Sequence, residues 1–480
     1  MSQVGGVAGD IVQDNRAAEL PESGLPEIGA RLDRLGSSRT MWTLIVLLCA
    51  GGFFDAYMLS SGSNIAPSLV HNGILKATTE GFFSLKGYAG FTGATFMGML
   101  LANAFISVLA DKFGRRTVFT FGLVWFSLCG AVMAFQNTSG ALIFWRFMMA
   151  IGMGLEVITI DSYLSELIPK MARGRAFVVN NSIHSTGQPM AALMAFLLVP
   201  QMFLGLEGWR WVVLVGALGA IVVWPLRLFI PESPRWLAAH GRLAAADRIV
   251  SNLEQRVERE IGRPLPPPLP VTHRPPHVVG RYAQIFGREY LGRTVMLSAF
   301  HVLQGIGLYG FINWMPTFLV HRGVSISHSL GYTFGMALVA PLGPLLCLSF
   351  ADRVERKWQI VGAALAVAAA GLAFSYFRSP YVIVPIGGFE LLSAAILSYN
   401  FHAYQAELFP TRIRVQAVGF VYSWARISAT FSGFLIAFIL GHYGVSWVFL
   451  LIAGSMALVA LFIGVMGPPS KNRSLEVLSP

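Results

Sequence analysis

Apolar stretches of about 20 residues, the length that crosses a bilayer as a helix, recur along almost the whole chain. Short polar segments separate them, and one longer polar segment divides them into two sets of six. The expected spans are 41–62, 87–110, 118–137, 140–164, 176–201, 210–230, 291–315, 328–350, 358–377, 381–404, 415–440 and 444–467. The pattern predicts an all-α membrane protein with twelve transmembrane helices in two six-helix bundles.

The polar segments set the expected domain boundaries. These are an N-terminal tail at 1–40, an N-terminal bundle at 41–230, a linker at 231–290, a C-terminal bundle at 291–467 and a C-terminal tail at 468–480. In the linker, apolar residues from Leu243 to Val257 recur at helical spacing, which predicts an amphipathic helix over 241–261 under the membrane domain. The prolines of 263–270 exclude a helix in that stretch.

Composition supports the membrane assignment. The chain is 55% hydrophobic and only 12% charged, whereas a soluble domain carries about 25% charged residues. The first apolar run has no small-residue cleavage site, so we expect no cleavable signal peptide. Cys49, Cys129 and Cys347 fall in separate spans, which predicts neither a disulfide framework nor a metal site.

The net charge of +11 has an uneven distribution. Most of the 35 lysines and arginines lie in the tails, the linker and the loops on one side of the expected membrane. The opposite loops hold only Lys76, Lys86, Arg210, Arg322 and Arg378. The positive-inside rule therefore predicts that both termini are cytoplasmic, in a plasma membrane (the inner membrane of a bacterium). The basic charge reflects topology, and we expect no nucleic-acid partner.

A charged phrase occurs twice at one offset. Residues 110–116 (ADKFGRR) are answered by 351–357 (ADRVERK), and 165–169 (SELIP) by 406–410 (AELFP), each 241 residues later. Two unrelated phrases at one offset indicate two equivalent halves. Internal repeats of this kind are typical of membrane transporters.

The repeated loop resembles the signature of the major facilitator superfamily, although Glu355 replaces the glycine of the second copy. The stretch from Arg146 to Gly174 and the phrase PESPRWL at 231–237 resemble the sugar porters of that superfamily. The resemblance implies a monomeric transporter that moves a small molecule by alternating access between two bundles. It implies no cofactor and no enzyme activity.

The sugar-binding positions match less well. Gln304 and Pro316 keep the sugar-porter spacing, but Leu303 and Tyr309 replace residues that contact sugar hydroxyls in that family. The segment 404–412 with Arg426 is similar to metabolite:proton and aromatic-acid:proton symporters. The resemblance therefore implies an organic acid or a sugar-like compound rather than a plain hexose. The expected substrate contacts are Gln188, Gln304, Tyr309, Asn313, Trp314, Asn400 and Arg426.

Ionisable residues within spans are costly and mark functional sites. The resemblance pairs Arg146 with an acid of span 1 at the position that Met58 occupies here. Asp55 lies three residues earlier, roughly one helical turn away, so it can face the same cavity. We interpret Asp55 as a proton carrier and Arg146 as its switchable partner. The alternative is a static ion pair that only joins two helices.

Other buried ionisable residues leave alternatives open. Arg426 holds a substrate carboxylate or is neutralised by an acid such as Glu390. At least one of Glu156 and Asp161 is expected at the cytoplasmic gate. The histidines of the spans have no shared ligand spacing and are expected to be satisfied core residues; they are His184, His301 and His402.

The repeated loops are expected to act as cytoplasmic latches that join in one state and separate in the other. Their residues are Asp111, Arg115, Glu166 and Arg175 in the first half, and Asp352, Arg356, Glu407 and Arg414 in the second. Three other functions stay open: a uniporter, an exporter, or a nutrient receptor that does not transport.

Overall fold

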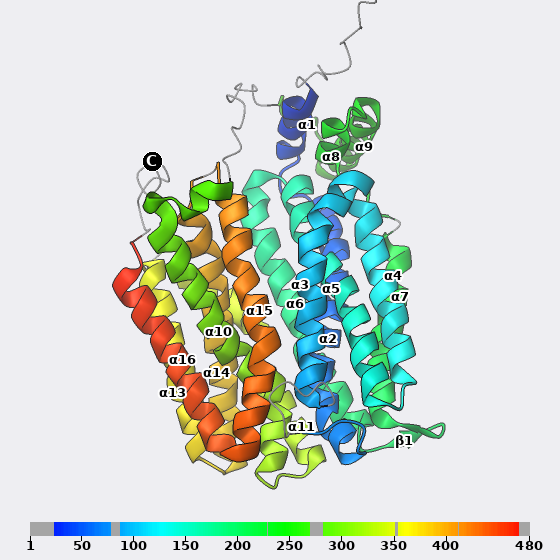
Figure 1. Ribbon diagram of the computed structural model, residues 1–480. Coiled ribbons are helices and arrows are strands. Elements are labelled where there is room, and N and C mark those ends of the chain that lie inside the picture. Colours follow the sequence, from blue (N-terminus) through cyan, green and yellow to red (C-terminus); the bar gives the residue numbers. More distant parts are fainter. Residues whose placement is uncertain are drawn as a thin grey trace, which may run out of the picture.

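The computed structural model describes residues 24–77, 87–227, 229–268, 282–350, 354–410 and 412–469, and it is almost entirely helical (Figure 1). The long helices of the first half are α2 (Arg39–His71), α3 (Tyr88–Phe113), α4 (Arg115–Ala134), α5 (Ser139–Leu167), α6 (Lys170–Leu198) and α7 (Gly208–Arg227). Those of the second half are α10 (Arg288–His321), α11 (Ile326–Ala337), α12 (Leu342–Phe350), α13 (Arg356–Tyr376), α14 (Pro380–Glu407), α15 (Arg414–His442) and α16 (Val445–Met466). Each expected span coincides with one of these helices, and α11 and α12 share one.

Within the described part of the chain, ten helical segments are long and apolar enough to cross a membrane, with α11 and α12 counted as one. Helices α3 and α6 are not among the ten. In α6, polar side chains such as Asn181, His184 and Gln188 interrupt the apolar pattern. The same residues make α6 a candidate for lining a path through the protein.

Two helices differ from the expected spans for local reasons. The span at 328–350 is divided into α11 and α12, because Pro341 lacks an N–H donor and disfavours a helical residue before it. Helix α2 continues past its expected end at 62, through a run of polar residues. There the hydroxyls of Ser61 and Ser63 donate to the carbonyls of Met58 and Ser60, both at 2.8 Å. The helix itself thus satisfies these groups, so they do not end it.

The helices form two bundles (Figure 1). In the first, α2 packs on α6, and α5 packs on both α3 and α4. In the second, α13 packs on α14 and α16, and α10 packs on α15 and α16. The bundles meet along α3 with α15, α6 with α11, and α2 with α10. The helices that carry most of the expected functional residues therefore lie between the bundles.

The internal repeat is visible in side-chain contacts. The hydroxyl of Tyr163 donates to the carbonyl of Pro231, after α7. The hydroxyl of Tyr404, which lies 241 residues later, donates to the carbonyl of Pro468 after α16, at 2.7 Å. In each half, a tyrosine of the fourth span thus fastens the chain as it leaves the sixth.

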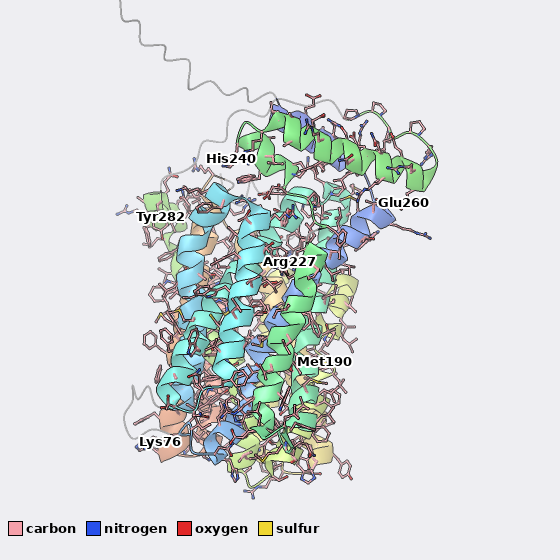
Figure 2. All side chains as sticks on the ribbon, turned by 90° about the vertical axis from the view of Figure 1, so that its right-hand side faces the viewer. Lys76, Met190, Arg227, His240, Glu260 and Tyr282 are labelled. Atoms are coloured by element: carbon pink, nitrogen blue, oxygen red, sulfur yellow. The ribbon has the colours of Figure 1, made fainter. Side chains whose placement is uncertain are left out.

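Three helices cover one end of the first bundle, which we call the linker end. They are α1 (Gly24–Asp33), α8 (Pro234–Ala239) and α9 (Leu243–Ile261), and Figure 2 shows His240 and Glu260 on this layer, above Arg227. Helix α9 matches the predicted amphipathic helix, with Ala246, Val250, Leu253 and Val257 buried. The opposite end carries the short hairpin of β1 (Met202–Phe203) and β2 (Leu206–Glu207) and is called the hairpin end.

Helix α1 lies within the expected polar tail, and its attachment is electrostatic as well as apolar. Glu254 of α9 accepts hydrogen bonds from Arg31 at 2.8 Å and from Arg34 at 2.6 Å. Burial disfavours the Glu254 carboxylate, but its bonds to the two arginines outweigh this and hold the pKa of the carboxyl below its ordinary value. Asp33 of α1 also lies 3.3 Å from the ammonium of Lys170 and 3.4 Å from the guanidinium of Arg235. Helix α1 therefore ties the linker helices to α6.

Candidate functional site

Arg146 of α5 is buried against α2 and α3. Its guanidinium donates to the hydroxyl of Thr95 at 2.8 Å and to the carbonyls of Met58 and Leu59 at 3.0 and 3.1 Å. A side chain at Gly62 would come within 2.5 Å of the guanidinium, so only glycine lets Arg146 approach α2 this closely. The predicted direct ion pair with Asp55 is not formed in this structure, because backbone carbonyls of α2 occupy the guanidinium instead.

Asp55 is instead adjacent to His184 of α6. The Nε2 atom of His184 lies 3.5 Å from Oδ2 of Asp55. The Asp55 side chain is 1% exposed, whereas that of His184 is 37% exposed. Neither carboxylate oxygen of Asp55 accepts a hydrogen bond from the described residues. His184 was expected to be a satisfied core histidine, and its place beside a buried acid is a correction.

Close packing of α2 and α6 creates this juxtaposition. A Cβ atom at Gly187 would lie 2.3 Å from the carbonyl oxygen of Phe53 and 2.7 Å from the amide nitrogen of Tyr57. The missing side chain at Gly187 thus lets α6 touch the backbone of α2 on both sides of Asp55. His184 lies one helical turn before Gly187, so it faces Asp55.

Glu156 of α5 was one of two residues considered for the cytoplasmic gate, but its partner is not a gate residue. It forms a fully buried ion pair with Arg227 of α7, whose guanidinium also donates to the carbonyl of Phe119 and lies 3.6 Å above that ring. Gly51 of α2 makes room for the pair, since a Cβ atom there would lie 2.0 Å from both charged groups. Glu156 is therefore committed to a contact inside the first bundle.

Arg426 of α15 is buried in the second bundle and faces the first. Its guanidinium lies 5.6 Å from the centre of the Tyr422 ring and 3.5 Å from the sulfur of Met99. No carboxylate of the described residues forms a salt bridge with it, and its Nε has no hydrogen-bond partner there. The expected alternative of neutralisation by Glu390 is thus not realised in this structure. Both oxygens of Glu390 are also buried without a partner among the described residues.

Aromatic rings surround the position of Arg426. The Tyr422 ring lies 5.4 Å from that of His402 and 5.5 Å from that of His301. His301 in turn is 2.9 Å from the amide oxygen of Gln405. Arg426 also interacts electrostatically with Tyr309, and with Asp55 across the bundle interface. The arrangement offers a cation among flat rings, near a buried acid.

Apart from Gln188, the remaining predicted substrate contacts divide into three groups. Gln304 is buried on the same helix as Tyr309, near His301. Asn400 donates to the carbonyl of Ile396 in its own helix at 2.9 Å, which favours packing over substrate contact. Asn313 and Trp314 close the hairpin end: the Tyr88 hydroxyl donates to the Asn313 carbonyl, and the Tyr88 and Trp314 rings lie 4.8 Å apart.

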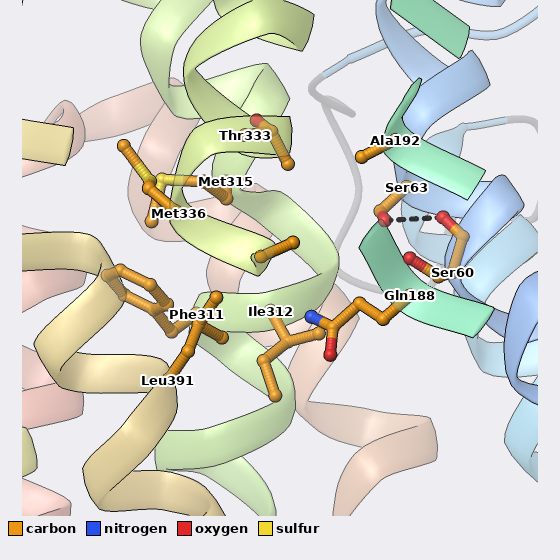
Figure 3. A pocket seen from close by; sticks show the side chains of 11 residues that line it. Ser60, Ser63, Gln188, Ala192, Phe311, Ile312, Met315, Thr333, Met336 and Leu391 are labelled. Carbon is orange, nitrogen blue, oxygen red and sulfur yellow. Dashed lines mark hydrogen bonds between the residues drawn. The ribbon is translucent and has the colours of Figure 1, made fainter. Parts of the chain in front are cut away.

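Gln188 of α6 reaches across the interface toward Ile312 of α10 (Figure 3). It lines a cavity of about 10 Å³ together with Ser60 and Ser63 of α2, Ile312 of α10 and residues of α11 (Figure 3). A cavity of this size holds about one water molecule. The bundles are therefore closely packed on this side, and Phe96 and Tyr309 extend the contact inward with ring centres 4.6 Å apart.

The predicted gate residues form two equivalent ion pairs. The guanidinium of Arg115 lies 3.0 Å from Glu166, and that of Arg356 lies 3.2 Å from Glu407, with the same offset of 241 between the two pairs. Each pair lies within its own bundle at the linker end. The side chain of Asp111 and the whole of Asp352 are outside the described residues.

Arginines after the fourth spans also repeat. Arg414 donates to the carbonyl of Phe409 at 3.1 Å, and its counterpart Arg173 donates to that of Ile168 at 3.4 Å. Arg175, the residue predicted for the first half, is exposed and has no ion pair with the described residues. Arg173 therefore replaces Arg175 in the pair of equivalent residues, as the shared offset would have indicated.

Comparison with known proteins places this geometry in a family. A family model described as sugar (and other) transporter matches residues 53–480. The chain belongs to this family, within the major facilitator superfamily. It is thus a multi-pass membrane transporter and not an enzyme, as the sequence predicts.

Similar proteins and solved structures agree with this family assignment. YyaJ of Bacillus subtilis, whose provisional name is that of a metabolite transport protein, is 31% identical over 93% of this chain and 96% of its own. The niacin transporter NiaP of Acinetobacter baylyi is 27% identical over 94% of this chain and 99% of its own. The inward open xylose transporter XylE of Escherichia coli is 18% identical and superimposes with a TM-score of 0.73, covering 91% of this chain and 99% of XylE. The last likeness confirms the expected twelve-helix fold.

Proposed function

We propose that this transporter is a proton symporter for a small organic metabolite that carries a carboxylate. The observation that carries the proposal is a pair of buried, opposite charges on the two sides of the bundle interface. Asp55 of α2 and Arg426 of α15 are both buried on helices of different bundles, and the carboxylate oxygens of Asp55 and the Nε of Arg426 have no hydrogen-bond partner among the described residues.

Asp55 has the properties of a proton carrier. A buried carboxylate that accepts no hydrogen bond is costly, and protonation removes that cost. When Asp55 is protonated, Arg426 also loses a compensating negative charge. An anionic substrate then restores the balance, because Coulomb interactions are strong where water is excluded. Proton and anion thus favour each other's binding, which is the thermodynamic requirement for symport.

Arg426 and its rings support an aromatic or otherwise planar acid. A guanidinium binds a carboxylate through two parallel hydrogen bonds, while Tyr309, Tyr422 and His402 offer faces for a flat body. Niacin, the compound named for the relative NiaP, is a pyridine carboxylate and fits this chemistry. It is therefore the first compound to test.

Alternating access would expose this site first at one end and then at the other. The hairpin end is closed here by Tyr88, Asn313 and Trp314. Positive charge concentrates at the linker end, so we assign that end to the cytoplasm. The pairs Arg115–Glu166 and Arg356–Glu407 would then brace the loops that meet when the linker end closes. We place the protein in the plasma membrane, as a monomer.

Uptake by proteoliposomes tests the proposal. Purified protein is reconstituted and given an inward proton gradient, with labelled niacin, other aromatic carboxylates, sugar acids and hexoses as substrates. We expect accumulation of a carboxylate that collapses with a protonophore and is lost in Arg426→Gln. Arg378→Gln, an exposed arginine, is the control. Strong transport of neutral hexoses alone would contradict the proposal.

The same assay separates the other functions. Gradient-independent equilibration would indicate a uniporter, and efflux driven by the opposite gradient an exporter. Ligand binding without any flux would indicate a receptor.

A further inference from the structure

We infer that Asp55 and His184 form one proton-binding unit, in which His184 is the more exposed member and passes the proton to and from Asp55. The inference rests on the proposed function of Asp55 and adds a second residue to it. Its basis is the contact between a buried carboxylate and a partly exposed imidazole, 3.5 Å apart, on two helices that pack backbone to backbone.

The unequal exposure of the two groups is the first step. Asp55 is 1% exposed, so water cannot reach its carboxylate directly in this state. His184 is 37% exposed and touches Asp55 with its Nε2 atom. A proton that arrives on the imidazole therefore needs only one short transfer, from Nε2 to Oδ2. The transfer converts imidazolium and carboxylate into neutral imidazole and carboxylic acid, so charge and protons balance.

Histidine suits this task chemically. Its ordinary pKa lies near neutrality, so it both gains and loses a proton under physiological conditions. The observed distance slightly exceeds a hydrogen bond, and proton-transfer contacts commonly tighten only in the active complex. The ring lies against Gly52, where a Cβ atom would be 3.7 Å from its Cδ2 atom.

Other charged groups surround the unit from each packed helix. Helix α5 contributes Glu156 and Asp161, which interact electrostatically with His184, and Arg146, which interacts with Asp55. Helix α7 contributes Arg227, which forms an ion pair with Glu156. Helix α15 contributes Arg426. Asp161 is exposed and lies near the linker end of α5.

Proton binding to the purified full-length protein tests the inference without any substrate. Difference titrations between pH 4 and 9 compare the wild type with Asp55→Asn, His184→Gln and the double variant. A coupled pair predicts non-additive curves, in which the effect of His184→Gln depends on whether Asp55 can be ionised. His71→Gln, which removes an exposed histidine of the same helix as Asp55, should give a curve that Asp55→Asn does not alter.

Kinetics tests the direction of transfer. After a pH jump, a phase of proton uptake that is absent in Asp55→Asn should be at least about tenfold slower in His184→Gln, because general acid–base groups contribute this much or more. His184→Asn repeats the measurement with a shorter side chain, in case glutamine disturbs folding. Additive titrations, or an unchanged uptake rate, would overturn the inference. Failure of the uptake panel would instead count against the proposed function and leave these curves intact.

Discussion

The buried pair of Glu156 and Arg227 gives a prediction whose size follows from the structure. Their side chains are 0% and 1% exposed, so neither charge is solvated by water. Removing one partner of such a pair leaves an uncompensated charge and costs about 3–5 kcal/mol. We therefore expect Glu156→Leu and Arg227→Met each to destabilise the first bundle by that amount.

Replacing both partners should have a much smaller effect. With Leu at 156 and Met at 227 no charge is buried, and apolar replacement of a buried pair is often neutral. The double variant loses the contact of Arg227 with the Phe119 ring, worth about 1–2 kcal/mol. It should accordingly be more stable than either single variant.

Thermal unfolding in detergent measures this cycle. For a unit the size of one bundle, about 3–5 kcal/mol corresponds to a melting temperature lower by at least about 6 °C. The single variants should show this loss, and the double variant should recover most of it. Single variants that melt with the wild type, or a double variant that loses the sum of both, would refute the assignment of Glu156 to a structural pair.

Three further predictions concern other parts of the molecule. Gly62→Ala should lower the melting temperature, because its Cβ atom would lie 2.5 Å from the Arg146 guanidinium, whereas Gly454→Ala, with open space around it, should not. Helix α1 should detach in acid: the pKa of Glu254 is held below its ordinary value, so the stabilisation is complete above about pH 4.3 and is lost as the pH falls through the folded pKa. The mobility of a spin label at residue 27 reports this detachment. In the Glu254→Gln variant, the label should be mobile at every pH. Arg356→Gln should change the free energy of unfolding by less than about 1 kcal/mol, since the Arg356–Glu407 pair is partly exposed. It should nevertheless shift the distance between two spin labels placed on the two bundles at the linker end. An unchanged distance would show that Arg356 is not a gate residue.

Periodicity and repetition predicted the frame of the molecule. The apolar spans located the helices, and the offset of 241 predicted that Arg115–Glu166 and Arg356–Glu407 occupy equivalent places. These features are local or duplicated, so a single sequence contains them. The division of α11 from α12 was also readable from Pro341, since proline acts on its own neighbours.

Contacts between helices were harder to predict. The partner of Asp55 depends on the rotation and register of α6 against α2, which Gly187 allows and no spacing within either helix reveals. The resemblance to sugar porters favoured Arg146, but that guanidinium is occupied by carbonyls of α2. The sequence did not predict helix α1, because arginines attach it to the linker and a segment rich in charged residues is typical of a solvated tail.

The residues proposed for chemistry are also those that the halves do not share. The offset partners of Asp55, Arg146 and His184 are Met296, Gly387 and Ala425. Duplication thus accounts for the repeated frame, whereas in the proposed mechanism one bundle would hold the proton and the other would hold the substrate carboxylate. The proposed coupling between Asp55 and Arg426 would then act across the interface between the two bundles.

Proton-driven accumulation by Asp55→Asn is the measurement that tests the central claim most directly. Wild-type proteoliposomes with an inward proton gradient should concentrate niacin or another carboxylate of the panel. The Asp55→Asn variant should lose that accumulation but retain exchange of labelled for unlabelled substrate, because binding and alternation do not require the proton to be released. Accumulation by Asp55→Asn equal to that of the wild type would contradict the account.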